Sequence, residues 1–201
     1  MKTAYFFLLP SIAFLALSCA PQNSETQEEQ PVGSTIDTTA APQSNTYNIQ
    51  VLDAEKPSPR KEMKGNIGKT EIIVNYGSPS VRNRKIWGGL EPYGEVWRSG
   101  ANEATTIQFF TDVMVEGKPL PKGRYGFFTI PRDGNWTVIF NGVAEQWGDF
   151  DYDSTKDLLR VEVTPQVKSD NAEQLDYLIE GNTVVLRWEK IAVPFNIQTI
   201  E

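Results

Sequence analysis

One short segment, residues 97–105 (the signature segment), gathers side chains suited to binding and proton transfer around a single glycine. Arg98 offers a forked cation for an anionic group, Asn102 an orienting amide, and Glu103 an acid or base. The same residues also suit a structural turn, in which Arg98 pairs with Glu103 or with a backbone carbonyl. Asn102 then caps the turn, and Gly100 adopts a positive φ. The residue types favour the structural turn and leave the site as the alternative.

Aromatic residues before and after the signature segment are candidates for stacking on flat ligands. Their faces suit sugar rings, and β-sandwiches often bind glycans in this way, which is an analogy at the level of the fold. Large aromatic side chains more often belong to the core, so burial is the competing interpretation for each. The candidates are Trp87, Tyr93, Trp97, Tyr125 and Trp147. Trp136 and Trp188 alternate with polar neighbours, and we predict that both are core residues.

Three alternating aspartates, Asp149, Asp151 and Asp153, are weak candidates for a metal site. On an extended strand all three would face one side, and clustered carboxylate oxygens suit Ca²⁺. Their spacing is not that of an EF-hand loop, and the terminal glutamate of such a loop is missing. A solvated acidic strand or loop is therefore the favoured interpretation, and we expect no bound metal or cofactor.

The composition excludes several classes of chemistry. The chain of 201 residues contains no histidine, which removes Ser-His-Asp and Cys-His catalysis and the histidine-containing zinc sites. Its one cysteine, Cys19, allows neither an intrachain disulfide nor a cysteine-based metal cluster. The net charge is −7 and no basic stripe is present, so we expect no nucleic-acid partner.

The N-terminus has the pattern of an export signal. Residues 1–18 combine Lys2 with a nearly continuous apolar run and small residues before Cys19, which predicts a secretory signal peptide. The cleavage region resembles the lipobox of bacterial lipoproteins, although Leu15 lies four residues before the cysteine instead of three. This resemblance implies cleavage before Cys19 and lipidation of that residue, and ordinary secretion is the alternative. We therefore predict a membrane partner through Cys19 and a place in the bacterial cell envelope, as an outer-membrane lipoprotein facing the periplasm or the cell surface.

Residues 19–46 read as a tether between this anchor and a domain. They are rich in Gln, Ser, Thr, Pro and Ala, carry several acidic residues, and contain no lysine or arginine. Few large apolar side chains occur, so the segment cannot bury enough surface to offset its conformational entropy. We predict a disordered acidic linker.

The remaining residues, 47–201, carry the alternating pattern of half-buried strands. Apolar side chains recur at every second position, and turn residues such as Asp133-Gly134 separate the runs. The predicted strands are residues 47–52, 72–76, 105–110, 113–115, 125–131, 136–141, 159–163, 175–179 and 183–189. We predict an all-β domain, an antiparallel β-sandwich, with a jelly roll as one option for its connectivity.

Three local features accompany this prediction. Residues 57–64 contain prolines and basic side chains and predict an irregular loop. Gly126 within a strand predicts a bulge or a close approach of another group. Residues 153–157 predict at most a single helical turn.

Several strings resemble a bacterial family catalogued as domain of unknown function twenty-nine eleven. The matching strings are residues 83–90, 92–105, 120–125, 128–131, 136–141 and 146–148. The resemblance covers most of the domain and implies a secreted or lipid-anchored protein of mostly β structure. It implies no known activity.

The sequence leaves three functions open. We expect a non-enzymatic binding or envelope-interaction module for a polar or glycan-like ligand. One alternative is a hydrolase-like enzyme that uses Glu103 with Arg98 and Asn102, and another is a purely structural envelope protein. A glycosidase needs two carboxylates at a defined separation, which the sequence cannot place for Glu91, Glu95 or Glu103.

Overall fold

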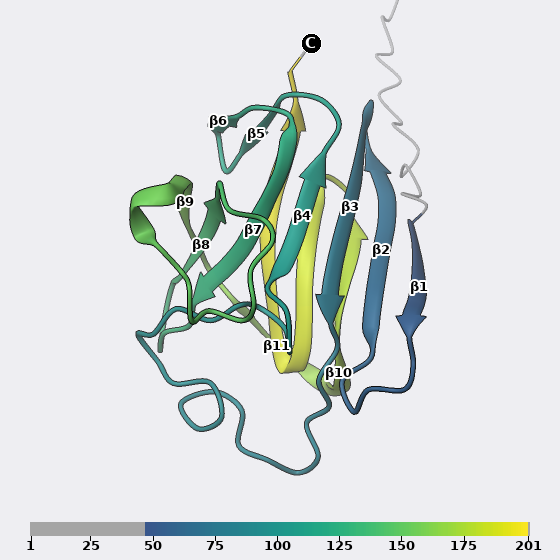
Figure 1. Cartoon of the computed structure of the whole chain (residues 1–201), viewed down its shortest axis with the longest axis vertical. Coiled ribbons are helices and arrows are strands. Elements are labelled where there is room, and N and C mark those ends of the chain that lie inside the picture. The colour runs from purple at the N-terminus through teal and green to yellow at the C-terminus, as the bar shows by residue number, and fades with distance from the viewer. Residues whose placement is uncertain (1–46, 201) are drawn as a thin grey trace, which may run out of the picture. The chain divides into compact units, whose positions relative to one another are not determined.

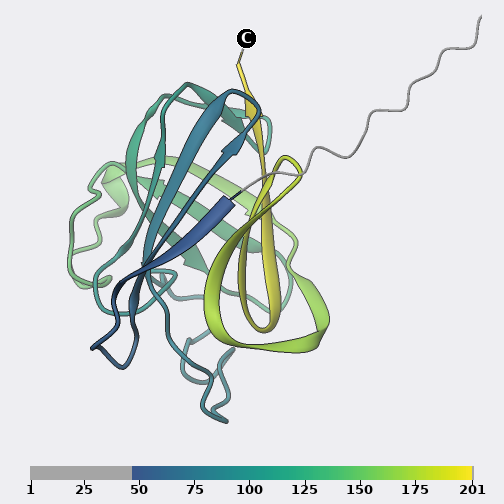
Figure 2. The ribbon, with the colours of Figure 1, turned by 90° about the vertical axis from the view of Figure 1, so that its right-hand side faces the viewer.

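The computed structural model describes residues 47–200. The predicted signal peptide, Cys19 and the tether lie outside these residues. The described chain forms two antiparallel sheets, which Figures 1 and 2 show from two sides. The predicted all-β sandwich is therefore confirmed. Among the described residues, no helix has the length and apolar character needed to cross a membrane.

Seven strands in the order β1-β2-β3-β4-β7-β8-β9 form the larger sheet. Their bounds are β1 (Tyr47–Asp53), β2 (Arg60–Ile67), β3 (Thr70–Gly77), β4 (Thr105–Phe109), β7 (Gly123–Ile130), β8 (Trp136–Asn141) and β9 (Asp157–Val163). The order follows the chain except between β4 and β7, where the chain crosses to the other sheet. Strands β3 and β4 are joined by a long connection, residues 78–104, which lies below the sheets in Figure 1.

The smaller sheet has the order β10-β11-β5-β6. Its strands are β5 (Val113–Val115), β6 (Lys118–Leu120), β10 (Gln166–Glu180) and β11 (Thr183–Thr199). Strand β11 pairs with β10 as far as Ala192 and with β5 from Ile197 onward. Pro194, which cannot donate a ladder hydrogen bond, lies between these two pairings.

Alternation explains how the strands face the core. Ile72, Val74 and Tyr76 of β3 are fully buried between the sheets, and Ile72 pairs with Phe109 while Val74 pairs with Ile107. Trp136 and Trp188 are also buried, as predicted. The prediction for Gly126 is confirmed as well, because a Cβ atom there would lie 2.5 Å from the Val143 carbonyl oxygen.

The predicted loop at residues 57–64 is wrong from Arg60 onward. Strand β2 begins there, and its buried positions include Lys61 and Met63. The pattern was obscured because one inward position holds a lysine, whose ammonium lies 2.7 Å from the Asp176 carboxylate. The hydroxyl of Tyr76 donates to the same carboxylate at 2.9 Å. The Lys61 ammonium also donates to Gln174 Oε1 at 3.1 Å. A buried cation with two polar partners therefore occupies a position where the alternation would place an apolar side chain.

Candidate functional site

The signature segment builds a buried hydrogen-bond network. The Ser99 carbonyl accepts from Thr105 Oγ1 at 3.0 Å and from the Tyr177 hydroxyl at 2.8 Å. The Ser99 hydroxyl lies 3.0 Å from Thr129 Oγ1. Ser99, Thr105 and Thr129 are all fully buried. The network joins the signature segment to both sheets, since Thr129 belongs to β7 and Tyr177 to β10.

The backbone of this segment differs from the prediction at Gly100. Positive φ values occur at Ser99 (55°) and Asn102 (65°), and not at Gly100. Glycine is required there for space, because a Cβ atom would lie 2.7 Å from Thr105 Oγ1 and 3.0 Å from the Gly77 carbonyl oxygen. The prediction of a left-handed Gly100 is therefore wrong. The reason for a glycine at this position is close packing.

Trp97 continues the line of β4 beside β7. Its N–H donates to the Thr129 carbonyl at 2.8 Å, and the Thr129 N–H donates back to Trp97 at 2.9 Å. The Trp97 side chain is 2% exposed and enters the core, whereas the next residue, Arg98, keeps a partly exposed side chain. A predicted stacking candidate is thus placed among core aromatics.

The structure separates the polar residues that could have formed one site. Arg98 Nη1 lies 3.5 Å from Asp149 Oδ2, so the Arg98–Glu103 pair expected for a structural turn does not form. The Glu103 carboxylate instead lies 3.3 Å from both Lys56 Nζ and Arg60 Nη1. Arg98 therefore contacts the loop after β8, whereas Glu103 contacts the β1–β2 loop and the first residue of β2.

Asn102 supports the same β1–β2 loop, because its side-chain amide donates to the Ser58 carbonyl at 3.2 Å. Burial opposes the ionisation of Glu103, yet hydrogen bonds from its own backbone and from Lys56, with the charge of Arg60, hold its pKa below the usual value. An ionised, paired carboxylate is a poor proton donor at neutral pH.

A different carboxylate, Glu91, has the properties of a proton donor. Burial raises the pKa of Glu91 to about 7, with Asp149 acting in the same direction and Arg98 and Arg84 in the opposite direction. The sequence offered Glu91 only as one of several carboxylates. Nothing in its immediate neighbours signals the burial, which comes from the folding of the 78–104 connection.

The three aspartates do not share one face of a strand, contrary to the geometry considered above. Residues 148–151 form a turn, and Asp149 pairs with Arg98. Asp153 caps a single 3-10 turn, Ser154–Lys156, by accepting from the Thr155 N–H at 2.9 Å. This turn confirms the predicted helical turn. Within residues 47–200, no group of three or more His, Cys, Asp or Glu side chains is placed to hold a metal ion.

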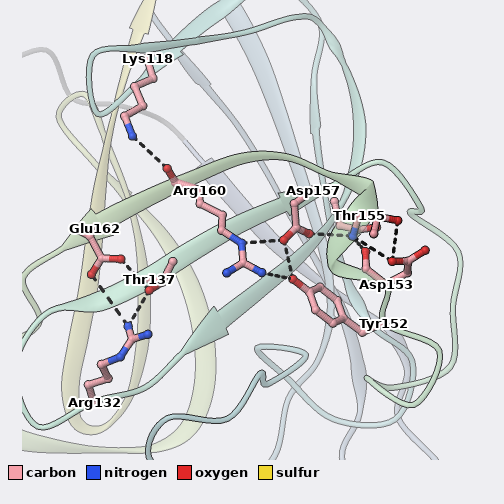
Figure 3. A network of polar contacts seen from close by, with 10 residues as sticks. Lys118, Arg132, Thr137, Tyr152, Asp153, Thr155, Asp157, Arg160 and Glu162 are labelled. Carbon is pink, nitrogen blue, oxygen red and sulfur yellow. Dashed lines mark hydrogen bonds and ion pairs between the residues drawn. The ribbon is translucent and has the colours of Figure 1, made fainter.

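Figure 3 shows the polar network that covers the outer face of β8 and β9. The Asp157 carboxylate accepts from the Tyr152 hydroxyl at 2.6 Å, Arg160 Nε at 2.7 Å and Asn141 Nδ2 at 2.8 Å. Burial, followed by the hydrogen bond to Asp157, raises the pKa of Tyr152 to about 12. The network attaches the loop between β8 and β9 to the sheet, so its polar groups are occupied by one another.

Four tryptophans pack together between the sheets: Trp87, Trp97, Trp136 and Trp188. The ring centroids of Trp87 and Trp136 are 4.7 Å apart in an edge-to-face arrangement, and those of Trp97 and Trp188 are 5.9 Å apart and stacked. Tyr125 is likewise buried, and its hydroxyl donates to the Pro121 carbonyl at 2.5 Å. Trp147 is 57% exposed, on the loop between β8 and β9.

A cleft of about 230 Å³ opens beside this tryptophan cluster. It brings together two of the predicted stacking candidates, Trp87 and Tyr93, with residues that the sequence did not single out as a site. The additional lining residues are Arg132, Asp133, Gly134, Asn135, Trp136, Thr164, Pro165, Val167 and Ile191. The cleft therefore lies where the 78–104 connection, the β7–β8 hairpin and the β9–β10 connection meet.

Tyr93 is the exposed aromatic group of the cleft. It is 47% exposed, and its ring packs on Gly88, where a Cβ atom would lie 2.8 Å from Tyr93 Cε2. Gly88 also has a φ of 66°, which side chains rarely adopt. Gly88, which has no side chain, thus packs against the Tyr93 ring, while much of Tyr93 stays accessible.

The polar side of the cleft comes from the β7–β8 hairpin. Asp133, Gly134 and Asn135 are exposed, and Asn135 Oδ1 accepts from the Thr164 hydroxyl at 3.0 Å. The Arg132 carbonyl accepts from Trp136 Nε1 at 3.0 Å, which fixes the hairpin to the tryptophan cluster. The sequence marked these residues only as a turn.

The fold and this site define an antiparallel β-sandwich that presents an aromatic cleft with polar groups at its rim. Residues 58–197 match the model of the family described as protein of unknown function, DUF2911, and the chain belongs to this family. No curated protein and no solved structure gives a significant match to the chain.

Proposed function

We propose that this protein is an envelope-anchored, non-enzymatic binding module that takes a small polar or glycan-like ligand in the cleft beside Trp87 and Tyr93. The observation that carries the proposal is the meeting of an exposed, glycine-supported aromatic ring with polar hairpin residues in one hollow. Aromatic faces and a few hydrogen-bonding groups are the usual elements of a small-molecule site.

The size of the cleft limits the ligand. A volume of about 230 Å³ lies below the range of roughly 300–1,000 Å³ that is typical of sites for drug-sized molecules. One ring, or the end of a chain of rings, fits such a hollow better than an enclosed oligomer. A glycan would then bind through a terminal unit and leave the rest of the chain in solvent.

The hydrolase alternative receives less support. Its general acid or base would be Glu103, whose carboxylate is engaged by Lys56 and Arg60. Arg98 is turned to Asp149, so the two groups do not face a common substrate position. The purely structural alternative agrees with the role of the signature segment, and it predicts that no ligand binds in the cleft.

Binding to a panel of simple sugars and short oligosaccharides, followed by intrinsic tryptophan fluorescence and NMR on the full chain, tests the proposal. Tyr93→Ala removes the exposed ring and is expected to weaken binding by about 10-fold or more, since base or ring stacking contributes on the order of 1–3 kcal/mol. Trp147→Ala is the matched control, because Trp147 is exposed but does not line the cleft. Equal loss in both variants, or no binding by the wild type, would leave the structural alternative.

The anchor is a separate part of the proposal and rests on the sequence around Cys19. Lipidation of that cysteine would tether the module to the outer membrane, facing the periplasm or the cell surface. Metabolic labelling with palmitate is the test. Wild-type protein is expected to incorporate label and Cys19→Ala is not, and equal labelling of the two would contradict lipidation.

A further inference from the structure

We propose that the ligand of the cleft carries a positive charge, as an ammonium group on or beside a small ring, with an amino sugar as the simplest example. This inference rests on the proposed binding function and names the class of ligand. It rests on the charged groups of the cleft and on the contacts that each group makes.

Asp133 supplies the negative charge of the cleft. It is exposed at the tip of the β7–β8 hairpin, and among residues 47–200 no hydrogen bond or ion pair engages its carboxylate. Its neighbour Asn135, in contrast, is occupied by Thr164. An ammonium group entering the cleft would therefore meet an acceptor that holds no competing internal cation.

Arg132 is the single cationic residue among those that line the cleft, and one of its terminal nitrogens is directed at residues outside the cleft. Its Nη1 atom donates to Thr137 Oγ1 at 2.6 Å and lies 4.0 Å from Glu162 Oε2. Thr137 Oγ1 in turn donates to Glu162 Oε1 at 2.7 Å. Figure 3 shows the guanidinium directed at these two residues on the outer face of β8 and β9. An anionic ligand would meet a guanidinium that is partly engaged by Thr137 and Glu162, together with a carboxylate that has no such partner among residues 47–200.

The aromatic walls favour the same charge. Trp87, Tyr93 and Trp136 line the cleft, and Tyr93 is the one of the three whose ring is largely accessible. The face of an accessible aromatic ring attracts a cation. An accessible aromatic ring together with an unpaired carboxylate suits an ammonium group. The formal charge of the whole chain, −7, also attracts cations over distances of about a Debye length.

The competing class, an uncharged ring, would use the aromatic walls and the hairpin amides but would gain nothing from Asp133. An anionic ring would be repelled by it. Three sugars with the same kind of ring but different charges separate these classes. They are glucosamine with its amine protonated, the uncharged N-acetylglucosamine, and the anionic glucuronate. Affinities are measured by isothermal titration calorimetry on the full chain at about pH 6, at low and high salt.

We expect glucosamine to bind about 10-fold more tightly than N-acetylglucosamine, with glucuronate the weakest, because the ammonium group forms a charge-assisted hydrogen bond with Asp133 that the other two sugars cannot form. High salt should reduce the preference for the amine. Asp133→Asn should bring glucosamine to the affinity of N-acetylglucosamine. This substitution keeps the size and shape of the side chain and removes its charge. Asp151→Asn, at another exposed aspartate outside the cleft, should keep the preference.

Two results would overturn the inference while leaving the proposed function intact. One is tighter binding of N-acetylglucosamine or glucuronate than of glucosamine, with the loss in Tyr93→Ala retained. The other is a preference for the amine that persists in Asp133→Asn. If none of the three sugars shifts a cleft resonance in the NMR spectrum of the wild type, the ammonium inference is wrong, and the broader sugar panel then decides the proposed function.

Discussion

The carboxylate of Glu103 lies 3.3 Å from the guanidinium of Arg60, 43 residues earlier in the chain, and not beside Arg98 in its own segment. The most chemically promising acid of the signature segment is thus used to hold the β1–β2 loop. Asn102, which donates to Ser58 of that loop, has the same role. The signature segment joins parts of the fold, and the cleft is lined by residues that lie before and after it in the chain.

Replacing Glu103 by Gln is therefore expected to affect stability and leave ligand binding unchanged. The side chain is 32% exposed, so losing its pairs with Lys56 and Arg60 should cost about 0.5–1 kcal/mol. Because the pKa of folded Glu103 is lowered, its contribution is present above the unfolded pKa and disappears as the pH falls through the folded value. Urea unfolding at about pH 7 and at about pH 3 measures both effects. Glu145→Gln, at a more exposed ion pair with Arg124, is the control with almost no expected change.

Gly100→Ala is expected to be among the most damaging small substitutions. The new Cβ atom would lie 2.7 Å from Thr105 Oγ1 and 3.0 Å from the Gly77 carbonyl oxygen, and it would disturb the buried hydrogen bond from Thr105 to Ser99. Overpacking of this kind costs about 1–3 kcal/mol. Gly142→Ala is the matched control.

The nearest atom to a Cβ at Gly142 is 3.4 Å away, so that change should alter the free energy of unfolding by less than about 1 kcal/mol. Denaturant titrations of the two variants give the comparison. Equal stabilities would show that the signature segment relaxes around the added methyl group, and close packing would then not be the reason for the glycine.

The ion pair between Lys61 and Asp176, which obscured the strand pattern of β2, can be tested by substitution. Asp176→Asn leaves the buried Lys61 ammonium without its carboxylate, which should cost about 2–3 kcal/mol even though Asp176 is partly exposed. Lys61→Met with Asp176→Asn removes both charges and keeps an acceptor for the Tyr76 hydroxyl. This double variant should recover most of the lost stability, because neither charge remains to be desolvated. A double-mutant cycle measures the coupling, and additive losses would contradict a direct pair.

The strands could be predicted where inward positions are apolar and could not be where they are polar. Strand β3 was predicted because Ile72, Val74 and Tyr76 alternate without interruption, whereas β2 was missed because Lys61 takes an inward position. Turn chemistry located the β7–β8 hairpin through Asp133-Gly134. Its role in a cleft was not predictable, since a residue's turn type contains no information about which distant loop packs beside it.

The same limit applies to the candidate site. Trp87, Trp136 and Ile191 line one hollow although they come from three separate parts of the chain. Composition and spacing identify each aromatic residue but not its exposure, so Tyr93 could not be distinguished from the buried Trp97. The partners of Arg98 and Glu103 also depend on how the loops fold back. Residue type predicted that they would form ion pairs, and only the structure assigns the partners.

Glu91 gives the last prediction, which concerns pH. Burial raises its pKa to about 7 in the folded state, against 4.5 for the ordinary carboxyl, so the folded state holds the proton more tightly. Below about pH 4.5 the group is protonated in both states and has no effect on stability. As the pH rises toward 7 the unfolded chain ionises first, stability falls, and above 7 the cost is constant.

Glu91→Gln imitates the protonated form and should remove this dependence. At about pH 8 the variant is expected to be more stable than the wild type by about 1–2 kcal/mol, a figure reduced from the full shift because the group is partly exposed. At about pH 4 the two proteins should be equally stable. Glu95→Gln, at an exposed position in the same connection, should show no gain at either pH. A stability difference that is the same at both pH values would mean that Glu91 acts through its shape or its hydrogen bonds, and not through its charge.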